Sequence, residues 1–191
     1  MAKTKRIEIR LPSKPANQEF WHGWRSRPDH KILVLAHGAV HLEYPADWVV
    51  EGDDDSIKLR DHEPPDDQCT LGVSYHFWPE LPGEHPALRV AALVETAMAG
   101  DERYTARDPI LEETRIDLHL AWSQGSFFDK SANREALSRL CIARRGEVQA
   151  LISFDFWADD LARCDALWHD ILATIQVAEW VEDPAKGPLL S

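Results

Sequence analysis

Apolar and polar residues alternate over several separate stretches of this chain, and this pattern constrains the fold more than any other feature. Alternation with a period of two is typical of β-strands that bury one face. It is clear over residues 6–11, 40–44, 70–77 and 114–122, and two further strands are predicted over 137–145 and 147–156. The last two are joined at Arg144-Arg145-Gly146-Glu147, where Gly146 can take the positive φ of a tight hairpin. The sequence therefore predicts a largely antiparallel sheet.

Two other segments carry the signals of helices. Pro86 stands where the first turn of a helix tolerates proline, the run 87–99 is rich in Ala, Leu and Val, and Gly100 supplies a stop. In the second segment Asp159 and Asp160 precede apolar residues at helical spacing. These residues are Leu161, Cys164, Leu167, Trp168, Ile171, Leu172 and Ile175. The predicted fold class is α+β, an antiparallel β-sheet packed with two main helices.

The domain organisation is predicted to be simple. With 191 residues, 44% apolar and 28% charged, the chain is long and apolar enough to form a single globular domain over residues 1–191. Residues 1–30 comprise the N-terminal strand and an irregular segment, and the stretch 16–31 is either a short helix or a packed loop. Residues 183–191 contain two prolines and a glycine and are predicted to be a tail.

The order of these elements resembles the PsbP, Mog1 and DcrB group of domains over residues 38–178. Two motifs carry the resemblance, an early aromatic-Pro-x-x-Trp turn and a late helix that ends in an aliphatic-Thr-aliphatic step. The matching residues are Tyr44, Pro45, Trp48, Ile171, Leu172, Thr174 and Ile175. The resemblance implies a PsbP/Mog1-like sandwich. It also implies a non-enzymatic role, because members look like GTPase-binding modules, photosystem subunits or effector chaperones, with no chemistry common to the group.

Charge and cysteine content indicate the compartment. The net charge of −12 argues against a general nucleic-acid or anionic-membrane surface. The longest aliphatic run, residues 32–36, is far shorter than the ~20 residues that span a bilayer. Cys69, Cys141 and Cys164 are widely spaced among apolar neighbours, as expected of reduced core thiols. Without a signal-peptide pattern at the start, the prediction is a cytoplasmic protein, in contrast to the exported and plastid members of the group.

Motifs of common enzyme classes are missing from the sequence. Neither G-x-x-x-x-G-K-[ST] nor G-x-G-x-x-G occurs, so nucleotide enzymes are disfavoured. Ser74 lacks the second glycine and the strand-to-helix turn of a hydrolase nucleophile, and His37 and His41 lack the glutamate of H-E-x-x-H. The sequence predicts no cofactor and no metal, and it favours a non-enzymatic adaptor or chaperone-like protein over an enzyme.

Two sets of residues are candidates for binding a protein partner. Residues 51–67 hold eight acidic side chains, Asp53, Asp54 and Asp55 among them, against two basic ones, with a short strand near Ile57 and Leu59. Such a run is usually a solvated face, but it also attracts a partner with a basic surface. Trp21, Trp24 and Trp78 lie outside the periodic segments. Tryptophan is frequent among the residues that dominate binding energy, although packing under loops is its commoner use.

The alternative hypothesis is a small-molecule or metal site, with or without catalysis, on the polar face of the sheet. Five candidate ligand-binding residues stand opposite the apolar face of the predicted strands, because alternation sends them to one side. They are His41, His76, Asp117, His119 and Asp155. If the strands are neighbours, three imidazoles and two carboxylates share one surface. The competing interpretation is a solvated polar face, which antiparallel sheets commonly have.

Overall fold

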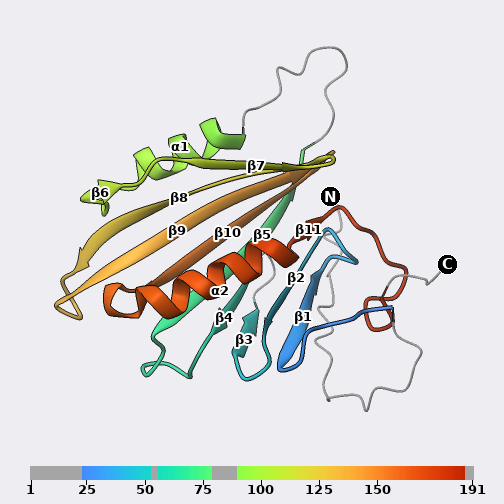
Figure 1. The fold of residues 1–191 in the computed structure, drawn as a ribbon, viewed down its shortest axis with the longest axis horizontal. Helices are drawn as coiled ribbons and strands as arrows, with labels where there is room; N and C mark the ends of the chain where they lie inside the picture. Colours follow the sequence, from blue (N-terminus) through green and yellow to red (C-terminus); the bar gives the residue numbers. More distant parts are fainter. Residues whose placement is uncertain (1–22, 53–55, 79–89, 188–191) are drawn as a thin grey trace, which may run out of the picture.

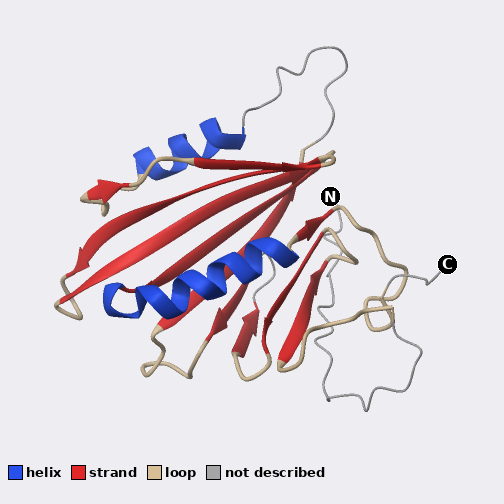
Figure 2. Ribbon diagram, viewed as in Figure 1, coloured by secondary structure: helices blue, strands red, loops and turns tan. Residues whose placement is uncertain are grey.

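The computed structural model describes residues 23–52, 56–78 and 90–187, and contains two antiparallel sheets and two α-helices (Figures 1 and 2). The predicted α+β class, with an antiparallel sheet packed against two main helices, is confirmed. The predicted strand 6–11, Pro86 and the start of the first predicted helix lie outside the described residues. Residues 23–29 contain no helix, and the first strand begins at His30.

The larger sheet has eight strands in the order β3-β4-β5-β10-β9-β8-β6, with β7 also paired to β8. Its strands are β3 (Val49–Gly52), β4 (Ser56–Arg60), β5 (Cys69–Phe77), β6 (Ala106–Arg107), β7 (Leu111–Arg115), β8 (Leu118–Asp129), β9 (Arg134–Arg145) and β10 (Val148–Trp157). The smaller sheet contains β1 (His30–Leu35), β2 (Val40–Pro45) and β11 (Gln176–Val177). The predicted hairpin is the β9–β10 pair, and Gly146 in its turn has φ 55°.

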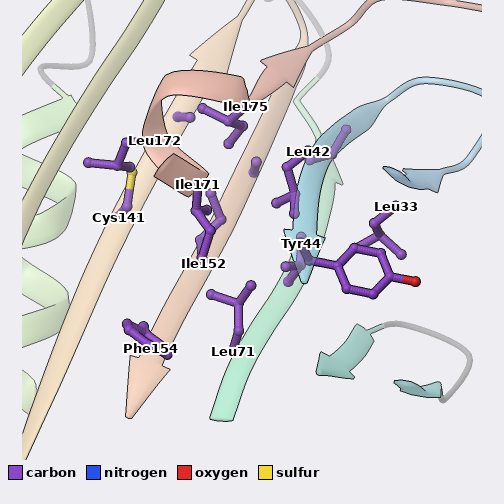
Figure 3. Close-up of a cluster of buried hydrophobic side chains, with 14 of the residues drawn as sticks. Leu33, Leu42, Tyr44, Leu71, Cys141, Ile152, Phe154, Ile171, Leu172 and Ile175 are labelled. Carbon is purple, nitrogen blue, oxygen red and sulfur yellow. The ribbon is translucent and has the colours of Figure 1, made fainter. Parts of the chain in front are cut away.

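The main core lies between one face of the larger sheet and a layer formed by helix α2 (Leu161–Thr174) and the smaller sheet. The inward residues of β10 are all at most 3% exposed, as the alternation predicts: Val148, Ala150, Ile152, Phe154 and Phe156. From α2, Trp168 stacks on Phe154 with ring centroids 6.0 Å apart. Figure 3 shows Ile171 and Leu172 of α2 over β10 and β9, with Leu42 of β2 alongside. Each large apolar side chain buried here stabilises the fold by about 1.5–3 kcal/mol.

Helix α1 (Val90–Gly100) packs on the opposite face of the larger sheet, which we term the outer face. Val90, Val94 and Met98 recur every four residues, so they form one stripe, and this stripe contacts Ala121 of β8 and Ile142 of β9. The helix covers only that part of the outer face. The residues that β5 and β10 present to this side are mainly polar, so much of it remains a polar surface.

The predicted strand over 114–122 is wrong, because a hairpin turn interrupts it. β7 ends at Arg115 and β8 begins at Leu118, with Ile116 and Asp117 as the turn. A two-residue turn pairs Arg115 with Leu118 and so places both on the same face. Arg115, expected opposite the apolar residues, therefore points toward α2 and donates a hydrogen bond to the Leu172 carbonyl at 2.8 Å.

The second helix follows Asp159 and Asp160, as predicted. Residues 158–160 form a short 3₁₀ turn, and the α-helix starts at Leu161. Asp159 and Asp160 lie in that turn, where carboxylates interact favourably with the exposed N–H groups. No helix in the described parts of the chain is long and apolar enough to span a membrane.

Candidate functional site

Two of the predicted ligand residues share a row across the outer face without approaching each other. The register aligns His119 of β8, Arg144 of β9, Gln149 of β10 and His76 of β5. Three strand spacings of about 4.8 Å separate the two histidines, so their backbones lie about 14 Å apart. Both are exposed, and His119 Nδ1 is 3.2 Å from Thr114 Oγ1. The pair is too far apart to bind one metal ion.

His41 lies in the smaller sheet and not on the outer face. It is 9% exposed, its ring packs edge-on against Trp24 at 4.7 Å, and its Nε2 is 3.3 Å from Glu179 Oε2. Burial lowers the pKa of His41, and the neighbouring Glu179 carboxylate partly offsets that effect. These contacts hold the chain segment after β11 against β2.

Asp117 and Asp155 also lie apart from the histidine row. Asp117 is in the β7–β8 turn, where Arg145 Nε donates to its Oδ2 at 2.8 Å and holds the pKa of the carboxyl below its usual value. Asp155 lies on the outer face of β10, and its pairing partner on β5 is Thr70. Thr70 and His76 are six residues apart on β5, so Asp155 lies about 20 Å from His76 along the strand, at ~3.4 Å per residue. In the described parts of the chain, no three His, Cys, Asp or Glu residues are grouped so as to hold a metal ion.

The candidate partner-binding residues differ in their surroundings. Trp21, Asp53, Asp54 and Asp55 lie outside the described residues. Trp24 is partly buried: its Nε1 donates to the Pro184 carbonyl at 2.9 Å, and its ring fills the space beside Gly187. Trp78 is 41% exposed, and the guanidinium of Arg144 lies 6.0 Å from its ring centroid. Of these six residues, Trp78 is the one that the structure places on an open surface.

Trp78 belongs to a group of exposed apolar side chains at one end of the larger sheet, which we term the aromatic end. Its members are Phe77, Trp78, Ile116 and Trp180, exposed by 55%, 41%, 100% and 57%. Phe77 and Trp180 stack with ring centroids 6.0 Å apart and an angle of 10° between the planes. The tips of β5, β7 and β8 converge at the same end of the sheet in Figure 1.

Ion pairs fix the chain segments that carry the aromatic end. Arg145, at the end of β9, binds Asp117 Oδ2 through Nε at 2.8 Å and Glu179 Oε1 through Nη1 at 3.2 Å. The first contact holds the turn that contains Ile116, and the second holds the residue before Trp180. Three segments distant in sequence are thereby joined at one guanidinium.

Sequence reasoning identified only part of the aromatic end. The sequence predicts Trp78 as a partner-binding residue, and Trp180 also lies outside the segments with strand or helix periodicity, close to the C-terminal tail. Phe77 and Ile116 followed the alternation and were expected to face inward. Alternation shows which side of a strand a residue faces, but it does not show where the layer formed by α2 and the smaller sheet ends. It therefore does not predict that Phe77 and Ile116 are exposed.

The three cysteines are free and buried, in agreement with the prediction of core thiols. Burial raises the pKa of Cys141 to about 12. A hydrogen bond with Cys164, together with burial, raises the pKa of Cys69. A nucleophilic cysteine needs a lowered pKa and an accessible sulfur, and neither Cys69 nor Cys141 has them.

Comparison with known structures confirms the PsbP/Mog1-like fold. The solution structure of cyanobacterial PsbP (CyanoP) from Synechocystis sp. PCC 6803 has a TM-score of 0.55 and 13% identity, covering 80% of this chain and 94% of that one. The Saccharomyces cerevisiae Ran-binding protein Mog1p has a TM-score of 0.50 and 11% identity, and the match covers 78% of this chain and 95% of Mog1p. A crystal structure from Bacteroides thetaiotaomicron VPI-5482 has a TM-score of 0.53 and 14% identity over 79% of this chain, which spans about half (49%) of that protein.

A sequence relative and a family model cover most of the chain. The uncharacterized protein alr1449 from Nostoc sp. (strain PCC 7120) is 29% identical over 189 residues, which are 98% of this chain and 97% of the relative. The model of the Alr1449 family matches residues 31–181. This protein therefore belongs to the Alr1449 family.

Proposed function

We propose that the protein is a non-enzymatic protein-binding module, an adaptor or chaperone-like protein, that docks its partner on the aromatic end. The observation that carries the proposal is the exposure of four large apolar side chains, Phe77, Trp78, Ile116 and Trp180, at one end of the sheet. Single exposed apolar residues are normal, but a group of them on a soluble protein marks an interaction surface. Tryptophan is also among the residues that most often dominate binding energy.

The aromatic end is organised before any partner arrives, which favours tight binding. Trp180 is stacked on Phe77, and Phe77 in turn packs edge-on against Tyr75 at 5.5 Å. Arg145 fixes the neighbouring segments through its two carboxylate partners. Side chains that are already ordered lose little conformational entropy on binding, so more of the contact energy appears as affinity.

Ile116 is an unusual residue for its position in the turn. Its φ is 52°, a left-handed conformation that β-branched residues rarely adopt, and its side chain is fully exposed. Such a conformation costs on the order of 1–3 kcal/mol and is found mainly at functional sites. An apolar side chain held in this way offers a projecting anchor for a pocket on a partner.

The partner proposed is a protein that presents apolar residues flanked by basic ones. The chain carries a net charge of −12, which attracts a basic partner over long range and speeds its association. One protein with the same fold, Mog1p, is named as Ran-binding, so this architecture is compatible with binding another protein. The fold does not identify the partner.

An affinity capture experiment with matched variants tests the proposal. Immobilised wild-type protein is expected to retain one protein from a lysate of the source organism in stoichiometric amount. The double variant Phe77→Ala/Trp180→Ala is expected to bind that protein at least 30-fold more weakly, since loss of hot-spot aromatics costs about 2 kcal/mol or more. Affinity is measured with the purified partner by calorimetry.

The control is Phe128→Ala. Phe128 is 48% exposed, like the members of the aromatic end, but it lies near the end of β8 at the opposite end of the sheet. Its loss is expected to leave affinity unchanged. The proposal is wrong if no protein is retained reproducibly, or if the double variant and Phe128→Ala bind the partner equally.

A further inference from the structure

Two of the three cysteines meet inside the main core. Cys69 is the first residue of β5 and Cys164 lies in the first turn of α2, and they are 2% and 0% exposed. Their side chains share a hydrogen bond, although about half of the chain lies between them. The β-sheet register places Cys69 opposite Phe156 of β10 and Cys141 opposite Ile152. Cys141 is therefore about 14 Å from Cys69 along the strands, at ~3.4 Å per residue.

A buried carboxylate holds together the two segments that carry this pair. Asp61 is 9% exposed, and its Oδ1 accepts hydrogen bonds from the backbone N–H groups of Gln68 at 2.8 Å and Cys69 at 3.2 Å. Its Oδ2 accepts a hydrogen bond from Arg163 Nη2 at 3.0 Å. Arg163 directly precedes Cys164 in α2, so Asp61 fixes the start of β5 against the first turn of the helix. The contact between the two thiols is thus set by the surrounding fold.

The surroundings make the two sulfurs chemically unequal. The hydrogen bond with Cys69 lowers the pKa of Cys164 and the Arg163 guanidinium lowers it further, against the opposite effect of burial. The same hydrogen bond, together with burial, raises the pKa of Cys69. The thiolate is the reactive form of cysteine. Cys164 is therefore the sulfur that reacts first, and Cys69 is the thiol that stands beside it.

A small reagent reaches Cys164 through the N-terminal turn of α2. Residues 161–163, which precede Cys164 in this turn, are exposed. Within the described part of the chain, the N-cap residue Asp160 makes no side-chain hydrogen bond that caps the helix. The ends of helices open at a lower free-energy cost than the core of a sheet. Opening of this single turn exposes Cys164 while β5 and its neighbours stay paired.

We propose that Cys69 and Cys164 are a redox pair that forms a disulfide on reaction with a peroxide and so fastens α2 to β5. The Cys164 thiolate attacks one oxygen of hydrogen peroxide, the O–O bond breaks, and the other oxygen takes up a proton and leaves as water. Cys164 is now a sulfenic acid. The Cys69 sulfur attacks the Cys164 sulfur, the S–O bond breaks, and the hydroxyl leaves as water with the Cys69 proton. Two thiols and one peroxide give one disulfide and two waters, and the two electrons pass from sulfur to oxygen.

The disulfide is expected to stabilise the protein reversibly. It closes a loop of about half of the chain, and a crosslink across a long loop restricts the unfolded state most. We expect Tm to rise by at least about 5 °C on oxidation for a chain of this length. A small dithiol reverses the reaction by thiol–disulfide exchange.

Peptide mass spectrometry of the full-length protein tests the proposal. Reduced protein is treated with equimolar hydrogen peroxide, unfolded in the presence of N-ethylmaleimide and digested. We expect a linked peptide that joins Cys69 to Cys164, two hydrogen atoms lighter than its two parts, and alkylated Cys141. Differential scanning calorimetry of the oxidised protein is expected to show the rise in Tm, and dithiothreitol is expected to abolish it. The linked peptide is measured in the wild-type protein, so this result does not depend on the folding of any variant.

Variants assign the rise in Tm to the pair. Cys69→Ala and Cys164→Ala are expected to show no rise on oxidation, and the matched control Cys141→Ala is expected to form the linked peptide and to show the wild-type rise. Circular dichroism of the reduced variants verifies that they fold. The proposal is overturned if all three thiols survive a tenfold excess of peroxide or if the linked peptide contains Cys141. Crosslinking at the same rate in concentrated urea, or a linked peptide without a rise in Tm, also overturns it.

Discussion

Arg139 is a buried cation on the core side of β9, where alternation alone favours an apolar residue. It is 3% exposed, and its guanidinium lies within 5.3–6.0 Å of the ring centroids of Trp122, Phe156 and Trp168. Nη2 donates to Asp165 Oδ1 at 2.8 Å and Nε to Gln124 at 2.8 Å. The guanidinium of Arg139 therefore packs between aromatic rings, and Asp165 at the surface balances its charge.

We expect Arg139→Ala to lower the free energy of unfolding by about 2–4 kcal/mol, because it leaves a cavity between three rings. Arg139→Met fills most of that volume, and Asp165 is solvated without its partner, so the loss is expected to stay below about 1.5 kcal/mol. Urea unfolding of both variants measures the difference. Equal losses would show that charge, and not packing, is the main contribution of Arg139.

His41 makes stability depend on pH. Because burial lowers its pKa in the folded state, the unfolded chain takes up a proton first as the pH falls. The contribution of neutral His41 to the free energy of unfolding is fully present above its pKa in the unfolded chain, about 6.5. It is lost as the pH falls from there through the lower pKa of His41 in the folded state. We expect the urea midpoint of wild type to fall more between pH 7.5 and 5.5 than that of His41→Gln. Parallel falls would contradict this assignment.

At the level of elements, alternation predicted β5, β9 and β10 well because the core covers one face over most of their length. The same signal failed at the β7–β8 hairpin, where Ile116 and Leu118 continue the pattern across a two-residue turn. The site was predicted less well than the fold. His76, His119 and Asp155 do share the outer face, but strand order, which no local pattern encodes, sets the distances between them.

The β7–β8 turn is expected to be improved by a residue that tolerates positive φ. Ile116→Asn relieves the left-handed strain and removes a fully exposed apolar side chain, so it is expected to stabilise the protein by about 0.5–1 kcal/mol. Differential scanning calorimetry should show a rise in Tm of about 1–4 °C for a chain of this length. The same variant is expected to bind the partner more weakly. A lower Tm would contradict the inferred strain.

For the molecule as a whole, the aromatic end is formed by segments that are far apart in the sequence. Phe77 and Trp180 stack on each other although more than half of the sequence separates them. The aromatic end therefore depends on the complete fold.

The strand order also has a consequence for how the protein is made in the cell. The early strands pair locally, β1 with β2 and β4 with both β3 and β5. The second edge of β5 pairs only with β10, the second edge of β2 only with β11, and the core between the sheets is closed by α2, so the early strands are completed by late segments. A ribosome releases β10, α2 and β11 well after the early strands, and one edge of β5 and one edge of β2 stay unpaired until then. We therefore expect the native structure to form only after β11 has been synthesised, at the slow rate typical of long-range strand pairing.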